Sequence, residues 1–216
     1  ADDLKLLDES LPINSDLTYG FLSDENKNYV SAVFTSSKDD YSEKVKIRYR
    51  GLMSNNWQAE KKSLRMKFPA ENLFLGAKAV NFIIPEDRQY FLEPLSNYRA
   101  EKFGLFSPKF SYARIFINNR NLGVYLVAEA WSPELLAKNN IIDNNNIFSN
   151  KDEKWVDINN VPAFYHWKSY TAEIEDGPFE ELNALGELVN KATDEEFNRK
   201  VEALVDLEKV YKWQII

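Results

Sequence analysis

The chain of 216 residues carries a formal net charge of -7 at pH 7 and is 44% hydrophobic, which predicts a folded protein and excludes a disordered one. It has no cysteine and one histidine, His166, which excludes disulfides, thiolate metal sites and cysteine nucleophiles and argues against a Ser-His-acid triad. The acidic balance argues against nucleic acid as a partner, and no window approaches the ~18 apolar residues of a membrane span.

The first 130 residues are predicted to be mainly β-structure with one helix. Residues 1–28 are polar and weakly patterned, so we expect an entry segment there. Alternating or β-branched residues predict three strands, at 29–35, 44–50 and 62–68. After an irregular link, 86–104 predicts a helix that Gly104 ends. A hairpin is expected from 111–118 and 122–130, around an Asn-rich turn.

The chain becomes helical in character after Trp131. Ser132 is expected to cap a short helix, and the apolar residues of 179–190 recur with a helical period. Thr193 and Glu196 form a capping box, and Asp206 is expected to cap a last helix. The sequence therefore predicts an α+β fold with an entry segment (1–28), a β-rich part (29–130) and a helical part (131–216).

A basic segment stands out in this acidic chain, with eight Lys or Arg residues and one acid between Lys44 and Lys67. Because side chains alternate along a strand, Lys44, Lys46, Arg48 and Arg50 share one exposed face, and Ser63, Arg65 and Lys67 should also face outward. The same alternation places Lys62 on the inward side.

Two interpretations of an inward Lys62 stay open. The lysine could extend to solvent at the strand end or protect an edge against aggregation. Alternatively, its charge could meet a phosphate or carboxylate, since a buried lysine is costly without an anionic partner. The preceding loop offers Gly51, the hydroxyl of Ser54 and free amide groups, which could hold an anion.

An ordered series of motifs then resembles the spore coat protein H (CotH) kinase family over roughly residues 30–150. The motifs are Arg50-Gly51, Ser54, Lys61-Lys62-Ser63, Leu75-Gly76, a helix from Asp87 to Leu105, the hairpin YARIFINNRNLGVYLVAEA and the aromatic Phe148. None of them is specific alone, and the resemblance rests on their order.

The resemblance implies an atypical protein-kinase-like fold that binds ATP and Mg²⁺ between a β N-lobe (29–130) and a helical C-lobe. Lys62 would then contact the phosphates beside the loop from Arg50 to Ser54. Glu93 would pair with Lys62, as the helix carboxylate does in kinases generally. Adenine would be bound by a hinge of three residues, Val127, Ala128 and Glu129. The family further implies a protein substrate and a spore-surface or cell-surface location.

Two departures from the family pattern affect these expectations. Pro94 follows Glu93, so the helix should break or start there. The family's catalytic aspartates follow helices like those at 179–216, so we expect this chain to lack them and to show little turnover. Asp143, Asp152 and Asp157 are expected to be solvated loop residues, and His166 structural. The alternative is a non-catalytic pseudokinase or a surface module that binds proteins or glycans, for which the tryptophans could offer a stacking surface.

Overall fold

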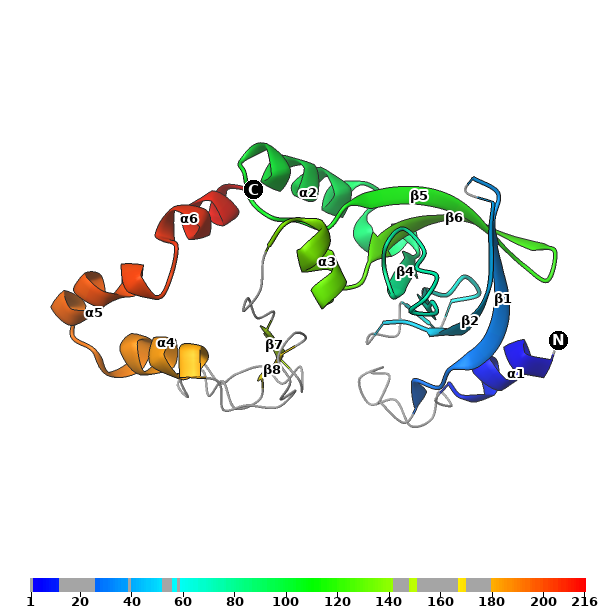
Figure 1. Ribbon diagram of the computed structural model, residues 1–216, viewed down its shortest axis with the longest axis horizontal. Coiled ribbons are helices and arrows are strands. Elements are labelled where there is room, and N and C mark those ends of the chain that lie inside the picture. The colour runs from blue at the N-terminus through cyan, green and yellow to red at the C-terminus, as the bar shows by residue number, and fades with distance from the viewer. Residues whose placement is uncertain are drawn as a thin grey trace. The chain divides into compact units, whose positions relative to one another are not determined.

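The computed structural model describes residues 2–11, 26–38, 40–51, 56–57, 59–141, 148–150, 167–169 and 180–216. It is a mixed α+β structure in which a curled six-stranded antiparallel sheet is followed by helices (Figure 1). The chain forms two compact units. Unit 1 comprises Ala1–Tyr98 with Ser107–Ala130, and unit 2 comprises Arg99–Phe106 with Trp131–Ile216.

The sheet of unit 1 has the strand order β1-β2-β3-β4-β6-β5. Its strands are β1 (Val30–Ser36), β2 (Tyr41–Tyr49), β3 (Leu64–Lys67), β4 (Ala79–Ile83), β5 (Phe110–Ile117) and β6 (Arg120–Glu129). The three predicted strands and the hairpin are confirmed, and the hairpin turns at Asn118 and Asn119, which have φ of 49° and 66°. The central strand β4 was predicted only as the end of an irregular link. It is buried on both faces, so its sequence lacks the alternation that marks a half-buried strand.

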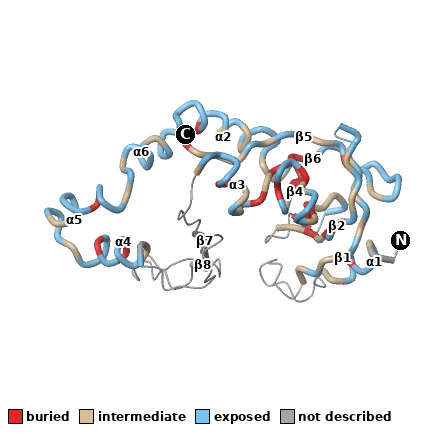
Figure 2. The backbone as a smooth tube through the Cα atoms, in the orientation of Figure 1, coloured by how far each residue is buried: buried red, intermediate tan, exposed pale blue. Residues whose placement is uncertain are grey.

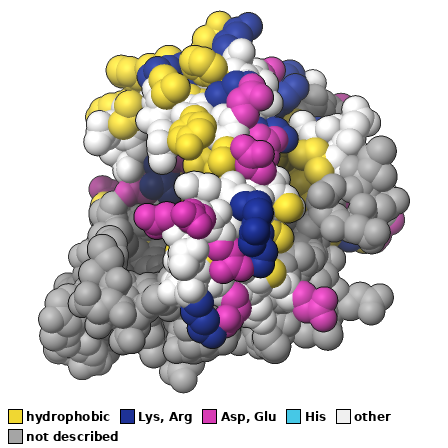
Figure 3. Space-filling model, turned by 90° about the vertical axis from the view of Figure 1, so that its left-hand side faces the viewer, with side chains coloured by type: hydrophobic (Ala, Val, Ile, Leu, Met, Phe, Trp, Pro, Cys, Tyr) yellow, Lys and Arg dark blue, Asp and Glu magenta, His cyan; other side chains and the backbone are white. Residues whose placement is uncertain are grey.

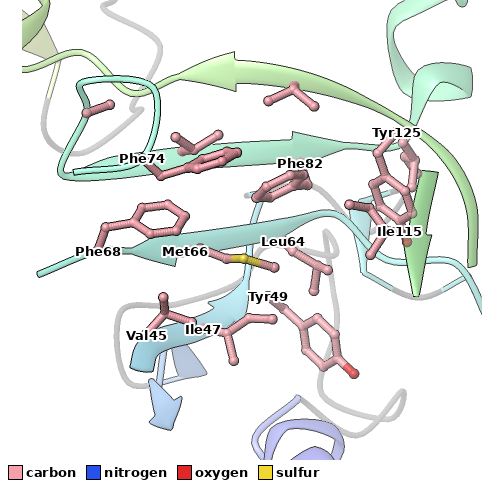
Figure 4. Close-up of a cluster of buried hydrophobic side chains, with 14 of the residues drawn as sticks. Val45, Ile47, Tyr49, Leu64, Met66, Phe68, Phe74, Phe82, Ile115 and Tyr125 are labelled. Carbon is pink, nitrogen blue, oxygen red and sulfur yellow. The ribbon is translucent and has the colours of Figure 1, made fainter. Parts of the chain in front are cut away.

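The main hydrophobic core lies on one face of the sheet. Figure 4 shows Val45, Ile47 and Tyr49 of β2 on the same side as Leu64 and Met66 of β3 and as Phe68, which directly follows β3. This confirms the predicted alternation. A smaller cluster on the other face contains Ile83, Leu126 and Ala128. Because hydrophobic clusters lie on both faces of the sheet, β4 and β6 contain many buried residues (Figure 2).

The prediction that Ser63 faces solvent is wrong. Its side chain is fully buried, and its Oγ accepts a hydrogen bond from the Ile84 amide at 3.0 Å. This bond fixes the start of the 3-10 helix η4 (Pro85–Arg88) at the end of the sheet where Ser63 lies. The second face of the sheet is therefore covered at this end.

The predicted helix over 86–104 is two elements, η4 and α2 (Leu92–Lys102). Between them Gln89 and Tyr90 have φ of 47° and 61°, which ends the first helix. Pro94 lies in the first turn of α2, where its missing amide hydrogen costs no helical bond. The expected start of a helix near Pro94 is thus confirmed.

A helix that the sequence did not predict, α1 (Asp2–Glu9), lies within the entry segment. Its Leu7 is 2% exposed and belongs to the main core, and Figure 1 shows α1 beside β1. The helix is short and mostly polar, and it buries one leucine fully. Its hydrophobic residues therefore show too weak a helical periodicity to be recognised in the sequence.

Unit 2 contains the predicted helices α3 (Pro133–Lys138), α4 (Glu180–Lys191), α5 (Asp194–Lys200) and α6 (Leu207–Ile215), with the 3-10 turn η6 (Val201–Ala203) and the strand pair β7 (Phe148–Asn150) and β8 (Trp167–Ser169). The caps of Ser132, Thr193 and Asp206 are confirmed, since each side chain accepts a backbone hydrogen bond from its helix. Figure 3 shows acidic and basic side chains interspersed on one face of the molecule.

Candidate functional site

The register between β2 and β3 separates the two residues on which the predicted phosphate site depends. Arg48 pairs with Arg65, and the Arg50 amide donates to the Ser63 carbonyl at 2.8 Å. Because paired residues point to the same face, Arg50 lies on the face of Ser63 and Arg65. The Lys62 ammonium instead lies 5.5 Å from the centroid of the inward Tyr49 ring. Arg50 and Lys62 therefore lie on opposite faces at the same end of the sheet.

Arg50 is the centre of what we call the arginine cluster, formed by Arg50, Arg65, Arg88, Asp87 and Glu93. Burial lowers the pKa of the Arg50 guanidinium to about 10, and the charges of Arg88 and Arg65 act in the same direction. The carboxylates of Glu93 and Asp87 oppose that shift without cancelling it. Within the described part of the chain, no hydrogen bond or ion pair satisfies this guanidinium. It is an incompletely compensated cation.

Three other members of the arginine cluster, Arg88, Asp87 and Glu93, are joined by ion pairs. Arg88 Nε lies 2.6 Å from Glu93 Oε2, and Arg88 Nη1 lies 3.8 Å from Asp87 Oδ2. Glu93 occupies the first turn of α2, where the helix dipole favours a negative charge. In the structure, Glu93 thus forms an ion pair with Arg88. It does not pair with Lys62, the partner expected from the sequence.

The loop after Arg50 approaches the sheet closely at its described ends. Gly51 has a φ of 111°, and a Cβ at this position would lie 2.2 Å from the Asn56 Cβ. The Asn56 carbonyl in turn accepts a hydrogen bond from the Ser63 amide at 2.9 Å. Asn56 and Trp57 are buried, so this position requires glycine.

Lys62 belongs to a separate group, the lysine cluster of Lys62, Tyr49 and Asp8. Its Nζ lies 3.8 Å from Asp8 Oδ1, which accepts a hydrogen bond from the Tyr49 hydroxyl at 2.7 Å. Burial, and then the bond to Asp8, raise the pKa of Tyr49 above its usual range. Lys62 faces inward, as alternation predicted, and the acid that meets it comes from α1.

Removing the ion pair of the lysine cluster is expected to lower the free energy of unfolding only slightly. Asp8 has a 54% exposed side chain, and the median exposed ion pair contributes roughly 0–1 kcal/mol. A double-mutant cycle of Asp8→Asn and Lys62→Gln, measured by urea unfolding, should give a coupling energy below about 1 kcal/mol. Tyr49→Phe should cost about 1 kcal/mol through its lost hydrogen bond. A coupling energy above about 2 kcal/mol would show that the pair is desolvated.

The predicted hinge residues lie inside the sheet. Val127 pairs with Phe82 of β4 and Ser111 of β5, and Ala128 likewise has a partner in both strands. Glu129 has a strand partner only in β4. Because β6 is a central strand here, the ladders on both sides use backbone groups of Val127 and Ala128. Their contact with adenine stays a prediction.

A cavity of about 1210 Å³ opens between the edge strands β1 and β5 of unit 1. Apolar core residues line its interior, among them Phe34, Phe74 and Ile115. Val127 is the one predicted site residue in its lining, and neither Arg50 nor Lys62 reaches it. The cavity reflects the open side of the curled sheet and lies apart from both charged clusters.

The sequence interpretation missed Arg65, Arg88, Asp87 and Asp8. Arg65 could have been found, because alternation already placed it outward like Arg50. The other three depend on the packing of η4 and α1, which no local pattern shows. Several earlier predictions lie outside the described residues, or have side chains that do: Ser54, Asp143, Phe148, Asp152, Trp155, Asp157, His166 and Trp167. Among the described residues, no three potential metal ligands come together, and no helix could span a bilayer.

The geometry thus defines an α+β protein with a half-buried arginine of lowered pKa at the end of a curled antiparallel sheet. The family model described as CotH kinase protein matches residues 47–216, which contain the whole arginine cluster and exclude α1. The chain therefore belongs to the CotH kinase family, as its motifs had indicated. A comparison with curated proteins found no match.

Proposed function

We propose that this CotH-family chain binds ATP with Mg²⁺ in an atypical protein-kinase-like fold, for phosphoryl transfer to a serine or threonine hydroxyl of a protein. In this proposal the curled sheet and α2 form the N-lobe, and the helices from Pro133 onward begin the C-lobe. Family membership and the order of sheet and helices support it. The spore-surface or cell-surface location expected from the family is part of the same proposal.

The observation that carries the proposal is the position of Arg50 at the end of the sheet, beside Gly51 and on the same face as Arg65. Burial and the charges of Arg88 and Arg65 disfavour its charged form, a bound anion would favour it, and its planar donors suit phosphate oxygens. The neighbouring Gly51 brings the backbone close, and Ser54 follows in the same loop. We therefore favour the face of Arg50 for the phosphates, and Lys62 becomes the competing assignment.

The residues of this face fit the phosphates better than they fit the metal. Bound Mg²⁺ would neutralise charge on the phosphate oxygens, as it does in kinases generally. Asp87 and Glu93 are the carboxylates of the arginine cluster, and both are engaged by Arg88. The described residues of this face offer positive charge that would hold and orient the phosphates. We assign none of them as a metal ligand.

Calorimetric titration with ATP and Mg²⁺ tests the proposal with two matched variants, Arg50→Gln and Lys62→Gln. Each removes one positive charge and keeps a polar side chain. Arg50→Gln should weaken binding by about tenfold or more, because a hydrogen bond to a charged group contributes roughly 1.5–3 kcal/mol. Lys62→Gln should change the affinity by less than about threefold, since an exposed pair with Asp8 contributes little. The reverse order would assign the phosphates to Lys62.

A second candidate, a non-catalytic interaction module, is favoured by one observation. Large apolar side chains are exposed at the start of α2 and on β5 of unit 1, namely Tyr90, Phe91, Leu95, Tyr98 and Tyr112. The Tyr112 hydroxyl donates to the Tyr90 carbonyl at 2.7 Å, which joins the two elements. Exposed apolar groups in such numbers mark interaction surfaces. A chain that ignores ATP yet retains a specific protein or glycan partner would support this candidate.

A further inference from the structure

We propose that an extended, acidic segment of a protein partner binds along the open edges of the sheet and adds a strand to it. The site is the cavity of unit 1 between β1 and β5, which we call the edge cavity. The partner segment would alternate apolar and acidic side chains. This inference goes beyond the proposed function, because it concerns a protein partner and does not depend on nucleotide binding.

The edge cavity follows the edges of two strands rather than one face of the sheet. β1 and β5 stand at the two ends of the strand order, so each pairs with a single described strand, β2 or β6. Every residue of 30–38 and of 111–118 lines the cavity. Because successive side chains point to opposite faces, a lining of consecutive residues follows the strand edge and its backbone. Backbone groups along an open edge are those that bind an added strand.

The inward side of the edge cavity is apolar and as long as a strand. Ala32 and Phe34 of β1, with Ala113 and Ile117 of β5, pack against the main core and line the cavity. β1 has seven residues and β5 has eight. A strand of seven residues is roughly 23 Å long. An occupant that follows both edges is therefore an extended segment of about the same length.

The outward side of the edge cavity carries a basic rim, formed by Lys38, Lys44 and Arg114. All three residues are exposed, and Lys44 and Arg114 each precede a buried residue of their strand, so they point outward. None of the described residues that line the cavity is acidic, although the net charge of the chain is -7. Glu43 of β2 is outside the lining and accepts a hydrogen bond from Asn72 at 2.6 Å.

The two sides of the edge cavity together specify the occupant. A segment whose backbone pairs with β1 or β5 would direct alternate side chains into the apolar interior and the others toward Lys44 and Arg114. Acidic side chains at those other positions complement the basic rim, and basic ones are repelled by it. A second copy of this chain would bring the same basic rim to the edge, so the charge favours a different protein.

Binding of designed peptides to the full chain, measured by fluorescence anisotropy, tests the inference. The labelled probe has about ten residues in which valine and glutamate alternate, and we expect it to bind saturably. A peptide with lysine in place of glutamate should bind about tenfold more weakly or less, because the rim repels it. Two further peptides carry N-methyl groups on either the valine or the glutamate amides. At least one should bind about a hundredfold more weakly, since several backbone hydrogen bonds are lost together.

Charge reversals in the protein test the basic rim. Lys44→Glu and Arg114→Glu should each weaken binding of the glutamate peptide about tenfold and strengthen binding of the lysine peptide. The matched control is Lys46→Glu, which makes the same change at an exposed position of β2 outside the lining. It should stay within about threefold, because salt screens a charge at that distance. Thermal melts show whether each variant is folded.

Hydrogen exchange locates the bound peptide, and the outcomes are distinct. Slower exchange of β1 or β5 amides in the complex supports strand addition, and unchanged exchange overturns it. Binding that ignores both sets of N-methyl groups overturns it as well, and would indicate a ligand held by side chains alone. No saturable binding of the glutamate peptide up to about 1 mM overturns the inference. So does concentration-dependent self-association that protects the same edges, which would make a second copy the occupant.

Discussion

Replacing Arg50 with methionine is expected to stabilise the unliganded protein and to weaken its binding of ATP by about tenfold or more. The Arg50 guanidinium is half-buried, and burial together with the charges of Arg88 and Arg65 lowers its pKa, so the folded protein disfavours its charged form. Removing that charge should stabilise the free protein by roughly 1–3 kcal/mol, since each unit of pKa shift corresponds to about 1.4 kcal/mol. The thermal midpoint should rise by about 2–4 °C for each kcal/mol in a chain of this size. Functional sites often contain residues that lower the stability of the free protein but are needed to bind the ligand, and we expect Arg50 to be such a residue.

The pH dependence of this gain has a defined sign. Because the pKa of Arg50 is lowered to about 10 in the folded protein, the unfolded chain binds more protons at higher pH, and the wild type gains stability as the pH rises through that value. The advantage of Arg50→Met should therefore be constant near neutral pH and shrink above about pH 10. Arg114→Met, at an exposed position, should stay within about 0.5 kcal/mol of the wild type. A destabilised Arg50→Met protein would show that Arg50 has a stabilising partner.

Replacing Gly51 with alanine is expected to be the most damaging single change near the site. The new Cβ would overlap the Asn56 side chain at 2.2 Å, and it would hold an L-residue at a φ of 111°. Left-handed backbone costs roughly 1–2 kcal/mol for a non-glycine residue, and displacing a buried side chain adds about 1–3 kcal/mol. Urea unfolding should therefore show a loss of about 2–5 kcal/mol, and binding of ATP should fall with it.

Two other glycines provide a matched control for Gly51. Gly104 and Gly123 also have positive φ, of 73° and 85°, and a Cβ added to either meets nothing within 4 Å. Alanine at these positions should lower the free energy of unfolding by about 1–2 kcal/mol, the cost of a left-handed backbone conformation for a non-glycine residue. The difference between Gly51→Ala and these controls measures the contact with Asn56. Equal losses at all three positions would contradict the close approach of the loop.

Much of the fold follows from local pattern. Alternation correctly separates Val45, Ile47 and Tyr49 from the basic face of β2, because each side chain has one of two environments. Capping residues such as Ser132 mark helix starts because their chemistry is local. The sequence did not predict β4 as a strand, because both of its faces are buried and its residues do not alternate between apolar and polar. Alternation identifies a strand only when one of its faces is exposed.

The candidate site was only partly predictable, for a different reason. The sequence indicated Arg50 and Lys62, but the loop between them leaves the strand register open, and a shift of one residue reverses every side chain. Glu93 meets Arg88, five residues earlier in the chain, because the backbone turns at Gln89 and Tyr90 between η4 and α2. Asp8 reaches Lys62 from a helix more than fifty residues earlier in the chain. Such long-range pairs follow from tertiary packing, which a single sequence does not display.

A crystal structure of the chain with bound ADP and Mg²⁺ tests the central claim most directly. We expect phosphate oxygens within hydrogen-bond distance of the Arg50 guanidinium, with Lys62 still beside Asp8. Phosphates bound to the ammonium of Lys62, with Arg50 making no contact with the ligand, would contradict the claim.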